Sequence, residues 1–472
     1  MSIRTWTLPI LLTLLAAAVA LHSQPPKATS TYKSPARYLT EEDAIAHGEK
    51  IGVGEALLDG PKEAVVDSYA KLKLTFRVGR AGMKTGGGIR LATAHGMGTD
   101  WGGMHLQTKN PNAENYLTYR ASTGSELKWS VAGAGVQNRF FNRYHPWQNI
   151  NEFKLTGASL KPGDTIEITM GGEPGVHLQQ WDEAAFMLKF YVDATGDDDY
   201  VPLKHNPAIR MNAGPAKVLH VTAPSTAETG KASWLNVWAE DGLGNPSAGY
   251  RGTVTFEPGD ARGLPAQYTF QAADNGVHRF EGITFPTAGT FRIRVREQSG
   301  ALSGEGNPTT IRTAAPADAI YWGDIHTHTM YSDGRGTPDE TYDFGKRVSA
   351  LDFTAVTDHA FLVEDWMWDD IRKSAARFNQ PGRFVSFLAY EWSGMSDVGG
   401  DHNVYTSDTD MPLIRCYSYF NYDNLRMYHG SKIGANHVDD LFRMLMPYFR
   451  NENLMVIPHY GGRHANPAFH NP

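Results

Sequence analysis

Cysteine is nearly absent from this sequence, because Cys416 is the only one in 472 residues. A single thiol excludes an internal disulfide framework and a zinc site built from several cysteines. Surplus positive charge is absent as well: 51 acidic side chains outnumber 44 basic ones, for a formal net charge of −7. Nonspecific nucleic-acid binding needs a basic surface, so we expect no nucleic-acid partner.

A long apolar run is also missing. The most apolar stretch, Leu8 to Leu21, falls short of the roughly 20 residues that a membrane-spanning helix needs. Arg4 precedes it and Ala18-Val-Ala20 fits a small-x-small cleavage pattern, so residues 1–21 are predicted to be a secretory signal peptide. We expect a periplasmic or secreted bacterial protein with no membrane contact after cleavage. The alternative is an uncleaved anchor.

The length predicts two to four domains. A polar, proline-bearing linker is predicted over residues 22–36, and residues 37–213 carry period-2 hydrophobic patterns that are typical of strands. Clear examples are Ala70–Val78, Glu152–Leu155 and Thr165–Met170, and Phe186–Asp193 is predicted to be another strand. Turn-forming Gly, Pro, Asp and Asn residues separate them. This region is predicted to be an all-β sandwich domain.

Residues 214–314 repeat the pattern in shorter segments. Six short strands are predicted, at 218–221, 234–238, 252–256, 268–270, 278–280 and 290–295. A region of this size with such strands indicates an immunoglobulin-like sandwich, here without a disulfide. Neither β region contains a chemical motif. Its Trp and Tyr side chains could form a face that stacks on sugars, but we favour core packing.

From residue 315 to 472, strands alternate with helices, which favours a parallel sheet or barrel. Strands are predicted at 319–329, 353–357, 384–390, 402–405 and 454–458, and helices at 338–350, 366–378 and 438–449. Thr337-Pro-Asp-Glu340 is a capping box with Pro at the first helical position. His437 is expected to start a helix rather than to bind a metal.

Metal-binding side chains recur where these strands end. Asp324, His326 and His328 alternate along the first strand, so they are expected to share one face, and Asp333 follows in a Ser-Asp-Gly loop. The later strands place a His or a carboxylate at equivalent positions, namely His359, Glu391, His402 and His459. Polar residues on a solvated strand face are the alternative. Because 321–472 holds nine of the 18 histidines, we favour a metal site.

Taken together, His-Thr-His-Thr, Ser-Asp-Gly, Thr-Asp-His, the strand-end Glu and Pro-His resemble the PHP (polymerase and histidinol phosphatase) superfamily of metallohydrolases. The β-rich region before them, with Trp147-Gln-Asn-Ile and Pro162-Gly-Asp-Thr-Ile-Glu-Ile, is similar to an exported group in that superfamily that carries domain of unknown function 3604. The resemblance implies two β-sandwich regions followed by a distorted (β/α)7 barrel that holds up to three divalent metals. Residues 315–472 supply too few strands to close such a barrel, so it is expected to be incomplete at the C-terminus.

By that resemblance, His326, His328 and Glu391 would hold one metal. Glu391 would bridge to a second metal held by His402 and His459, and Asp333 and His359 would hold the third. Mixed nitrogen and oxygen ligands suit zinc, manganese or iron. The family's last motif, Asp-x-His, is missing after His459. We expect this motif beyond Pro472 in a longer chain, and the alternative is a barrel that has lost it.

Other charged residues near these motifs have weaker predicted roles. Asp324 could orient an imidazole or make a strand-edge hydrogen bond. Arg335 and Arg463 could clamp a phosphate, although an ordinary surface arginine is favoured for each. Asp358 and Asp401 precede ligands and are interpreted as backbone-capping residues.

The sequence therefore predicts an exported metal-dependent hydrolase, with phosphoester hydrolysis as the favoured activity. Its partner would be a small-molecule or phosphorylated substrate, and no oligomeric state is assigned. Two alternatives stay open. One is hydrolysis of another ester or an amide at the same metals, and the other is a β-sandwich binding protein with a degenerate barrel.

Overall fold

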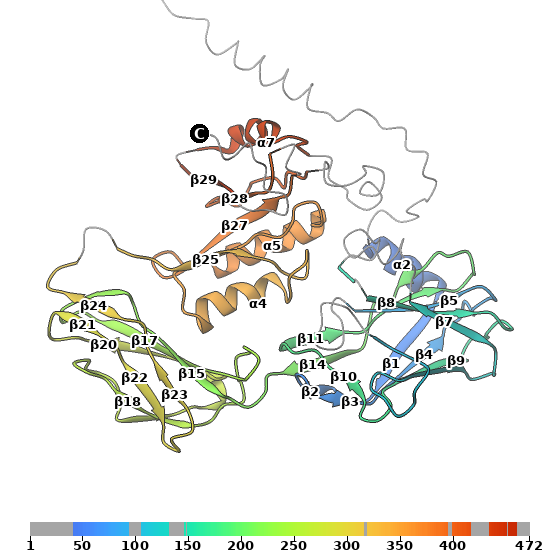
Figure 1. The fold of residues 1–472 in the computed structure, drawn as a ribbon. Coiled ribbons are helices and arrows are strands. Elements are labelled where there is room, and N and C mark those ends of the chain that lie inside the picture. Colours follow the sequence, from blue (N-terminus) through green and yellow to red (C-terminus); the bar gives the residue numbers. More distant parts are fainter. Residues whose placement is uncertain are drawn as a thin grey trace, which may run out of the picture.

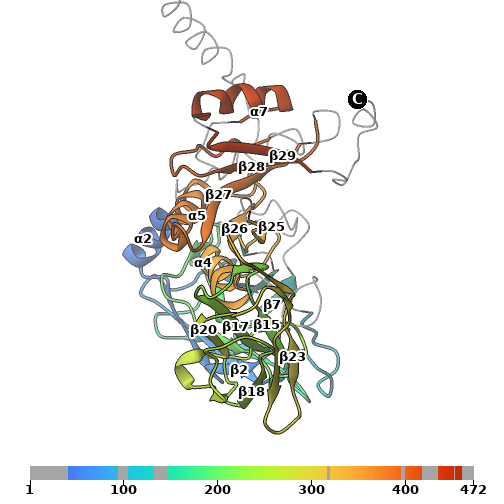
Figure 2. The ribbon, with the colours of Figure 1, turned by 90° about the vertical axis from the view of Figure 1, so that its left-hand side faces the viewer.

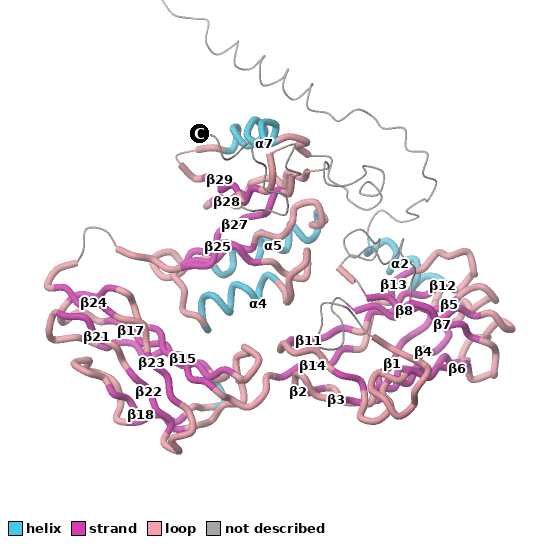
Figure 3. The backbone as a smooth tube through the Cα atoms, viewed as in Figure 1, coloured by secondary structure: helices cyan, strands magenta, loops and turns pink. Residues whose placement is uncertain are grey.

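The computed structural model describes most of the chain between residues 41 and 459. The described ranges are 41–93, 105–131, 146–147, 149–315, 319–394, 399–416, 434–450 and 452–459. The predicted signal peptide, the predicted linker and Arg463 lie outside them. Within these ranges strands dominate, and they form three groups of sheets that follow one another along the chain (Figure 1; Figure 3).

The first β group comprises helix α2 (Glu41–Ile51) and fourteen strands. The strands are β1 (Gly54–Asp59), β2 (Glu63–Val65), β3 (Tyr69–Ala70), β4 (Leu72–Val78), β5 (Gly88–Thr93), β6 (Leu117–Ala121), β7 (Leu127–Val131), β8 (Asn149–Leu155), β9 (Thr165–Met170), β10 (Val176–His177), β11 (Glu183–Met187), β12 (Lys189–Asp193), β13 (Val201–Pro202) and β14 (Ala208–Asn212). Two larger sheets, β1-β4-β9-β6 and β13-β12-β5-β8-β7, accompany the smaller sheets β11-β14-β2 and β10-β3.

Alternating hydrophobicity explains how the two larger sheets pack. In β4, Leu74 and Phe76 are buried and the residues between them are less so, and Ile168 of β9 joins them. Phe153 and Phe190 of the other large sheet belong to the same core, so the two sheets face each other as a β-sandwich. The predicted single strand Phe186–Asp193 is wrong, because β11 and β12 lie in different sheets and separate at Leu188.

The second β group follows. It contains β15 (Val218–Thr222), β16 (Thr226–Glu228), β17 (Ser233–Glu240), β18 (Thr253–Glu257), β19 (Gln267–Thr269), β20 (Val277–Ile283), β21 (Gly289–Phe291), β22 (Arg294–Glu297), β23 (Ser303–Glu305) and β24 (Thr309–Arg312), with a 3-10 turn at Ala272–Asp274. The sheets β15-β17-β20, β16-β24-β21 and β19-β18-β22-β23 enclose one hydrophobic core. The predicted strand at 290–295 is instead two strands, β21 and β22, in different sheets.

The α/β group is a mixed five-stranded sheet with helices. Its elements are β25 (Gly323–Thr327), α4 (Pro338–Asp343) and the π-turn Phe344–Val348, β26 (Phe353–Val356), α5 (Asp365–Phe378), β27 (Val385–Trp392), β28 (His402–Thr406), α7 (Val438–Leu445) with a 3-10 turn at Met446–Tyr448, and β29 (Leu454–Pro458). The strand order is β25-β26-β27-β28-β29.

This sheet differs from the parallel arrangement that its alternating elements predict. β25, β26 and β27 are parallel, but β27–β28 and β28–β29 are antiparallel pairs. Among the described residues the sheet is open, with β25 and β29 at its edges, so this part of the chain does not form the predicted (β/α)7 barrel. The predicted capping box is confirmed, because Thr337 and Glu340 bond reciprocally at the start of α4.

The two faces of the sheet have different surroundings. On one face, Tyr390 and Trp392 of β27 pack in a large core with residues of α4, α5 and α7, and α7 lies alongside β28 and β29 (Figure 2). The other face carries a small cluster centred on Ala389 and Tyr405. Because side chains alternate along β27, Glu391 belongs to this second face.

Contacts with both β groups hold the α/β group in place. The side-chain Nδ2–H of Asn236 in β17 donates a hydrogen bond to the carbonyl oxygen of Val348 at 2.8 Å. Met330, two residues after His328, packs against a cluster of the first β group that includes Trp147 and Tyr200. Among the described residues, every helix is too short or too polar to pass through a bilayer.

Candidate metal centre

The first strand of the α/β group does not keep the alternation that its sequence predicts. The pairing of β25 with β26 breaks register between Asp324 and Thr327. Asp324 turns to the backbone, and its Oδ1 accepts a hydrogen bond from the His326 amide at 3.1 Å. Asp324 and Thr327 line a cavity of about 750 Å³ where the three groups of sheets meet. Of the predicted trio on this strand, only His326 and His328 therefore take part in the donor groups described below.

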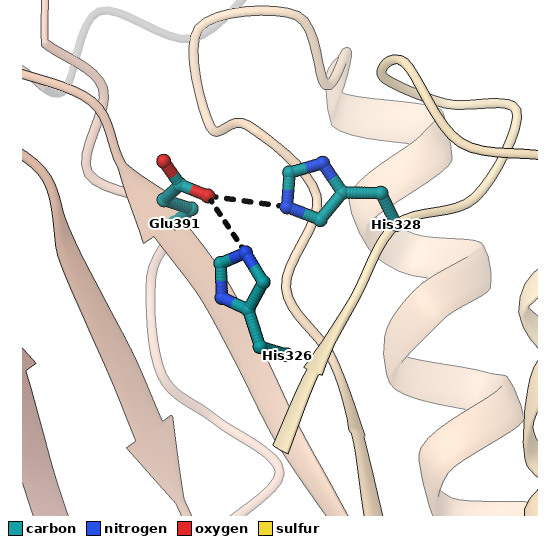
Figure 4. Close-up of side chains that lie close together, drawn as sticks. All are labelled: His326, His328 and Glu391. Atoms are coloured by element: carbon teal, nitrogen blue, oxygen red, sulfur yellow. Dashed lines mark hydrogen bonds and ion pairs between the residues drawn. The ribbon is translucent and has the colours of Figure 1, made fainter. Parts of the chain in front are cut away.

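Glu391 is the centre of the arrangement. Its Oε2 atom lies 3.1 Å from His328 Nε2 and 3.6 Å from His326 Nε2 (Figure 4). Glu391 is buried, with 2% of its side chain exposed, whereas 36% of the His326 side chain is exposed. Two imidazole nitrogens and a carboxylate oxygen thus converge within 4.8 Å of one another, with one side open to solvent.

A second donor group lies on the other side of His328. His328 Nδ1 is 2.6 Å from Asp333 Oδ1, and His359 Nε2 is 3.6 Å from the same oxygen. His359 follows β26 and forms an isolated parallel bridge with Glu391. Its Nδ1 atom lies 2.8 Å from the hydroxyl of Ser393, a partner that carries no motif and that the sequence analysis missed.

A third donor group consists of Glu391, Asp401 and His459. His459 follows β29 and donates its backbone amide to the Asp401 carbonyl oxygen at 2.8 Å. The Nδ1 atom of His459 is buried and has no hydrogen-bond partner among the described residues. A buried ring nitrogen without a partner is an expected feature of a site that binds a cation.

His402 does not join these groups, so its predicted placement beside His459 and Glu391 is wrong for the described structure. In the β27–β28 ladder, His402 pairs with Trp392 and Asn403 pairs with Glu391. Because neighbouring side chains alternate, His402 points to the helix-covered face, where its ring contacts Trp392 and Phe442. Asp401, predicted to cap backbone groups, lies on the Glu391 face instead.

Protons and carboxylates balance one another in this site. Burial opposes protonation of His328 and His359, but hydrogen bonds to Asp333 and Glu391 outweigh it and raise their pKa values to about 10 and about 9. Burial would favour the neutral carboxyls, yet the same hydrogen bonds hold the pKa values of Asp333 and Glu391 well below their usual range. Two cationic rings and two anions result, and metal cations could replace the ring protons.

The two nitrogens of His328 cannot both bind a metal as a neutral ring, because neutral imidazole has one lone pair. If Nε2 binds a cation with Glu391, then Nδ1–H donates to Asp333, which fixes the ring orientation. If Nδ1 binds a cation with Asp333 and His359, Nε2–H faces Glu391. The donor set therefore fits divalent metals, but His328 serves one of its two groups at a time.

Asp358 fastens the loop that carries these donors. It is fully buried and accepts hydrogen bonds from the Thr329 amide at 2.7 Å, the Thr329 hydroxyl at 2.6 Å and the Ser332 hydroxyl at 2.5 Å. The loop between His328 and Asp333 is thereby tied to the end of β26. The backbone-capping role predicted for Asp358 is therefore seen at the Thr329 amide. The sequence signal for this role was the position of Asp358 directly before His359.

Of the two arginines predicted to clamp a phosphate, Arg335 is the one within the described residues. The Arg335 guanidinium lies 3.4 Å from the centre of the Trp181 ring and lines the cavity between the groups of sheets. Burial lowers its pKa. Arg463 lies outside the described residues. His437 caps α7 as predicted, since its Nδ1 accepts from the Asp439 amide.

Comparisons with known proteins cover only part of this site. A family model described as "Protein of unknown function (DUF3604)" matches residues 362–465. This range includes Glu391, Asp401 and His459 but begins after His359. Similarity to that group is thereby confirmed for residues 362–465. The part of the resemblance that rests on the β-rich region around Trp147 and Pro162, and the wider resemblance to the PHP superfamily, stay predictions.

An uncharacterized protein of Chlamydia pneumoniae is 23% identical over 278 residues, which is 55% of this chain and 43% of that protein. This chain thus spans less than half of that relative's length.

Solved structures add no functional argument. A putative membrane-anchored protein from Corynebacterium diphtheriae is 12% identical, with a TM-score of 0.17 and 56% of each chain covered. A cohesin module of a Clostridium perfringens family 33 glycoside hydrolase is 13% identical, with a TM-score of 0.21, covering 34% of this chain and 99% of the module. Similarity at this level gives no support to any particular activity.

Proposed function

We propose that this protein is an exported, metal-dependent hydrolase and that phosphoesters are its substrate class. One observation carries the proposal: three groups of His, Asp and Glu donors overlap at Glu391 and His328. Their six residues beyond Glu391 come from the ends of different strands and from the loop after β25. A solvated surface would not gather them around a carboxylate with 2% of its side chain exposed.

The donor chemistry suits multinuclear hydrolysis. Bound divalent cations would supply Lewis acidity and produce a nucleophile from water at neutral pH. Glu391 would hold two of the cations close together, because it belongs to two donor groups. The exposed edge of His326 leaves an approach for substrate on the solvent side. His359, whose Nε2 lies 3.6 Å from Asp333 Oδ1, would hold or move a proton there.

The phosphoester class rests on the resemblance of the combined motifs to the PHP superfamily. Export rests on the pattern of Arg4, the apolar stretch and Ala18-Val-Ala20. Neither arginine predicted to hold phosphate contributes to this argument. Recognition of the phosphoryl group is proposed for the metals, and the predicted role of Arg463 stays a prediction.

Activity of the full-length protein tests this proposal. The protein is loaded with Zn²⁺, Mn²⁺ or Fe²⁺ and assayed for phosphate release from aryl phosphate monoesters and diesters. We expect His326→Ala to lose most of the activity, whereas the control His205→Ala, an exposed histidine between β13 and β14, retains it. Equal rates in the His326 variant and the wild type would contradict the proposal.

The same preparation separates the alternatives. Hydrolysis of carboxylic esters or amides but not phosphoesters, with the same dependence on His326, would replace the substrate class and keep the metal chemistry. Fewer than one bound metal per chain, with no hydrolysis of any substrate, would favour a binding protein with a degenerate site.

A further inference from the structure

Asn403 contacts a predicted metal ligand although no motif includes it. Its side-chain Nδ2 lies 2.7 Å from Nδ1 of His326. It stands opposite Glu391 in the β27–β28 ladder, so both side chains reach the same face. Only 5% of Asn403 is exposed. A buried amide thus lies directly behind an imidazole whose other nitrogen faces Glu391.

The contact decides which nitrogen of His326 carries the proton. With Nδ2 donating to Nδ1, the neutral ring must hold its proton on Nε2, the nitrogen that faces Glu391. A metal held with Glu391 and His328 needs the opposite tautomer, in which Nε2 offers its lone pair and Nδ1 is protonated. His326 therefore needs a partner that can serve either tautomer.

An asparagine amide is such a partner. The Oδ1 atom of Asn403 is buried and has no hydrogen-bond partner among the described residues. Rotation of the amide by half a turn exchanges Oδ1 and Nδ2, so that Oδ1 accepts from Nδ1–H of His326 and gains the partner that it lacks. The rotated amide then fixes His326 in the tautomer and orientation that a metal ligand requires.

We infer that Asn403 is a positioning residue that sets the tautomer of His326 and readies Nε2 for a divalent cation. This inference rests on the proposed metal site for its purpose, but the contact with His326 exists without a metal. Aspartate at this position could only accept, and leucine could do neither. The three side chains are similar in size and differ in hydrogen bonding, which makes the position testable.

The first measurement needs no metal. Long-range ¹H–¹⁵N NMR of histidine-labelled, metal-free protein at pH 8, with His326 assigned from a His326→Gln sample, reports the protonated nitrogen. We expect the proton on Nε2 in the wild type and on Nδ1 in Asn403→Asp. Identical His326 spectra in the wild type, Asn403→Asp and Asn403→Leu would overturn the inference whether or not the protein binds metal.

The second measurement is zinc affinity by competition with a chromophoric chelator. We expect Asn403→Leu to weaken the tightest site by about 10- to 100-fold, the usual loss for a missing partner behind a ligand, and Asn403→Asp to preserve it. The control Asn151→Leu removes a buried asparagine that bonds Trp129 in the first β group and should leave zinc affinity unchanged. Wild-type affinity in Asn403→Leu would overturn the inference. No zinc binding by the wild type would instead refute the proposed function, and the NMR result would still stand.

Discussion

Replacing Glu391 with glutamine removes the negative charge at the centre of the donor groups and keeps the shape of the side chain. Glu391 and Asp333 together raise the pKa of His328 from 6.5 to about 10, against the effect of burial. That rise of about 3.5 units corresponds to about 5 kcal/mol of preference for the protonated ring. If Glu391 supplies somewhat less than half of this preference and contributes similarly at His359, the free energy of unfolding of the metal-free Glu391→Gln variant should fall by about 3 kcal/mol.

The direction of the pH dependence follows from linkage. The folded pKa of His328 lies above its ordinary value of 6.5, so its stabilisation is complete below pH 6.5 and is lost as the pH approaches 10. Glu391→Gln should therefore be less stable than the wild type at pH 7, and the difference should shrink toward pH 10. Urea unfolding in EDTA, followed by hydrogen exchange in peptides from β26 to β28, measures this sheet separately from the two β groups.

Zinc provides the second part of this prediction. A ligand present at about 1,000 times its dissociation constant stabilises the folded state by about 4 kcal/mol. The wild type should gain stability of this order with zinc, and Glu391→Gln should gain far less because two donor groups lose their shared member. Glu305→Gln, an exposed carboxylate paired with Arg294 in the second β group, is the control. Equal stability in EDTA, or an equal gain with zinc, would refute the reasoning.

Three further predictions concern other buried charges. Burial raises the pKa of Glu183 from 4.5 to about 7, so the stability of the wild type should fall as the pH rises between these values. In urea unfolding, Glu183→Gln should be more stable than the wild type by about 3 kcal/mol at pH 8 but not at pH 4. The same difference in stability at both pH values would contradict this prediction. Zinc binding should release about two protons at pH 7.5, because the raised pKa values of His328 and His359 keep both rings protonated in the metal-free protein. Calorimetry in buffers of different ionisation enthalpy measures the number of protons released. Zinc binding without proton release would contradict the protonation of these two rings. Asp358→Asn should lower the free energy of unfolding by about 2 kcal/mol and speed hydrogen exchange in residues 329–334, because the loop loses a charged hydrogen-bond acceptor. Unchanged hydrogen exchange in these residues would exclude this role for Asp358.

Local sequence patterns predicted much of the fold because local physics controls those elements. The period-2 pattern gave β4 and β9, and the Thr337 capping box gave the start of α4. The pattern failed where one apolar run supplies two sheets, as at Leu188, because both faces of such a run are buried and nothing local marks the change of partner.

The sequence predicted most residues of the candidate site but not the direction in which each side chain points. Strand ends correctly drew attention to His326, His328, His359, Glu391 and His459, which the structure brings together. The pairing of β28 with β27 decides that Asp401 and Asn403, rather than His402, face Glu391. Register depends on partners distant in sequence, so a single chain read locally could not supply it. The same holds for Arg335, whose partner Trp181 belongs to another group of sheets.

The membership of Glu391 in two donor groups has a consequence for how cations would load. Glu391 would hold a first cation, whose charge would offset that of the carboxylate, so the affinity for a second cation would differ from that of the empty site, and the influence would be reciprocal. Loading would then be stepwise, with separate dissociation constants, and scarcity of one ion would leave a half-filled form. The ratio of those constants, more than either alone, would set the cation supply at which the whole site fills.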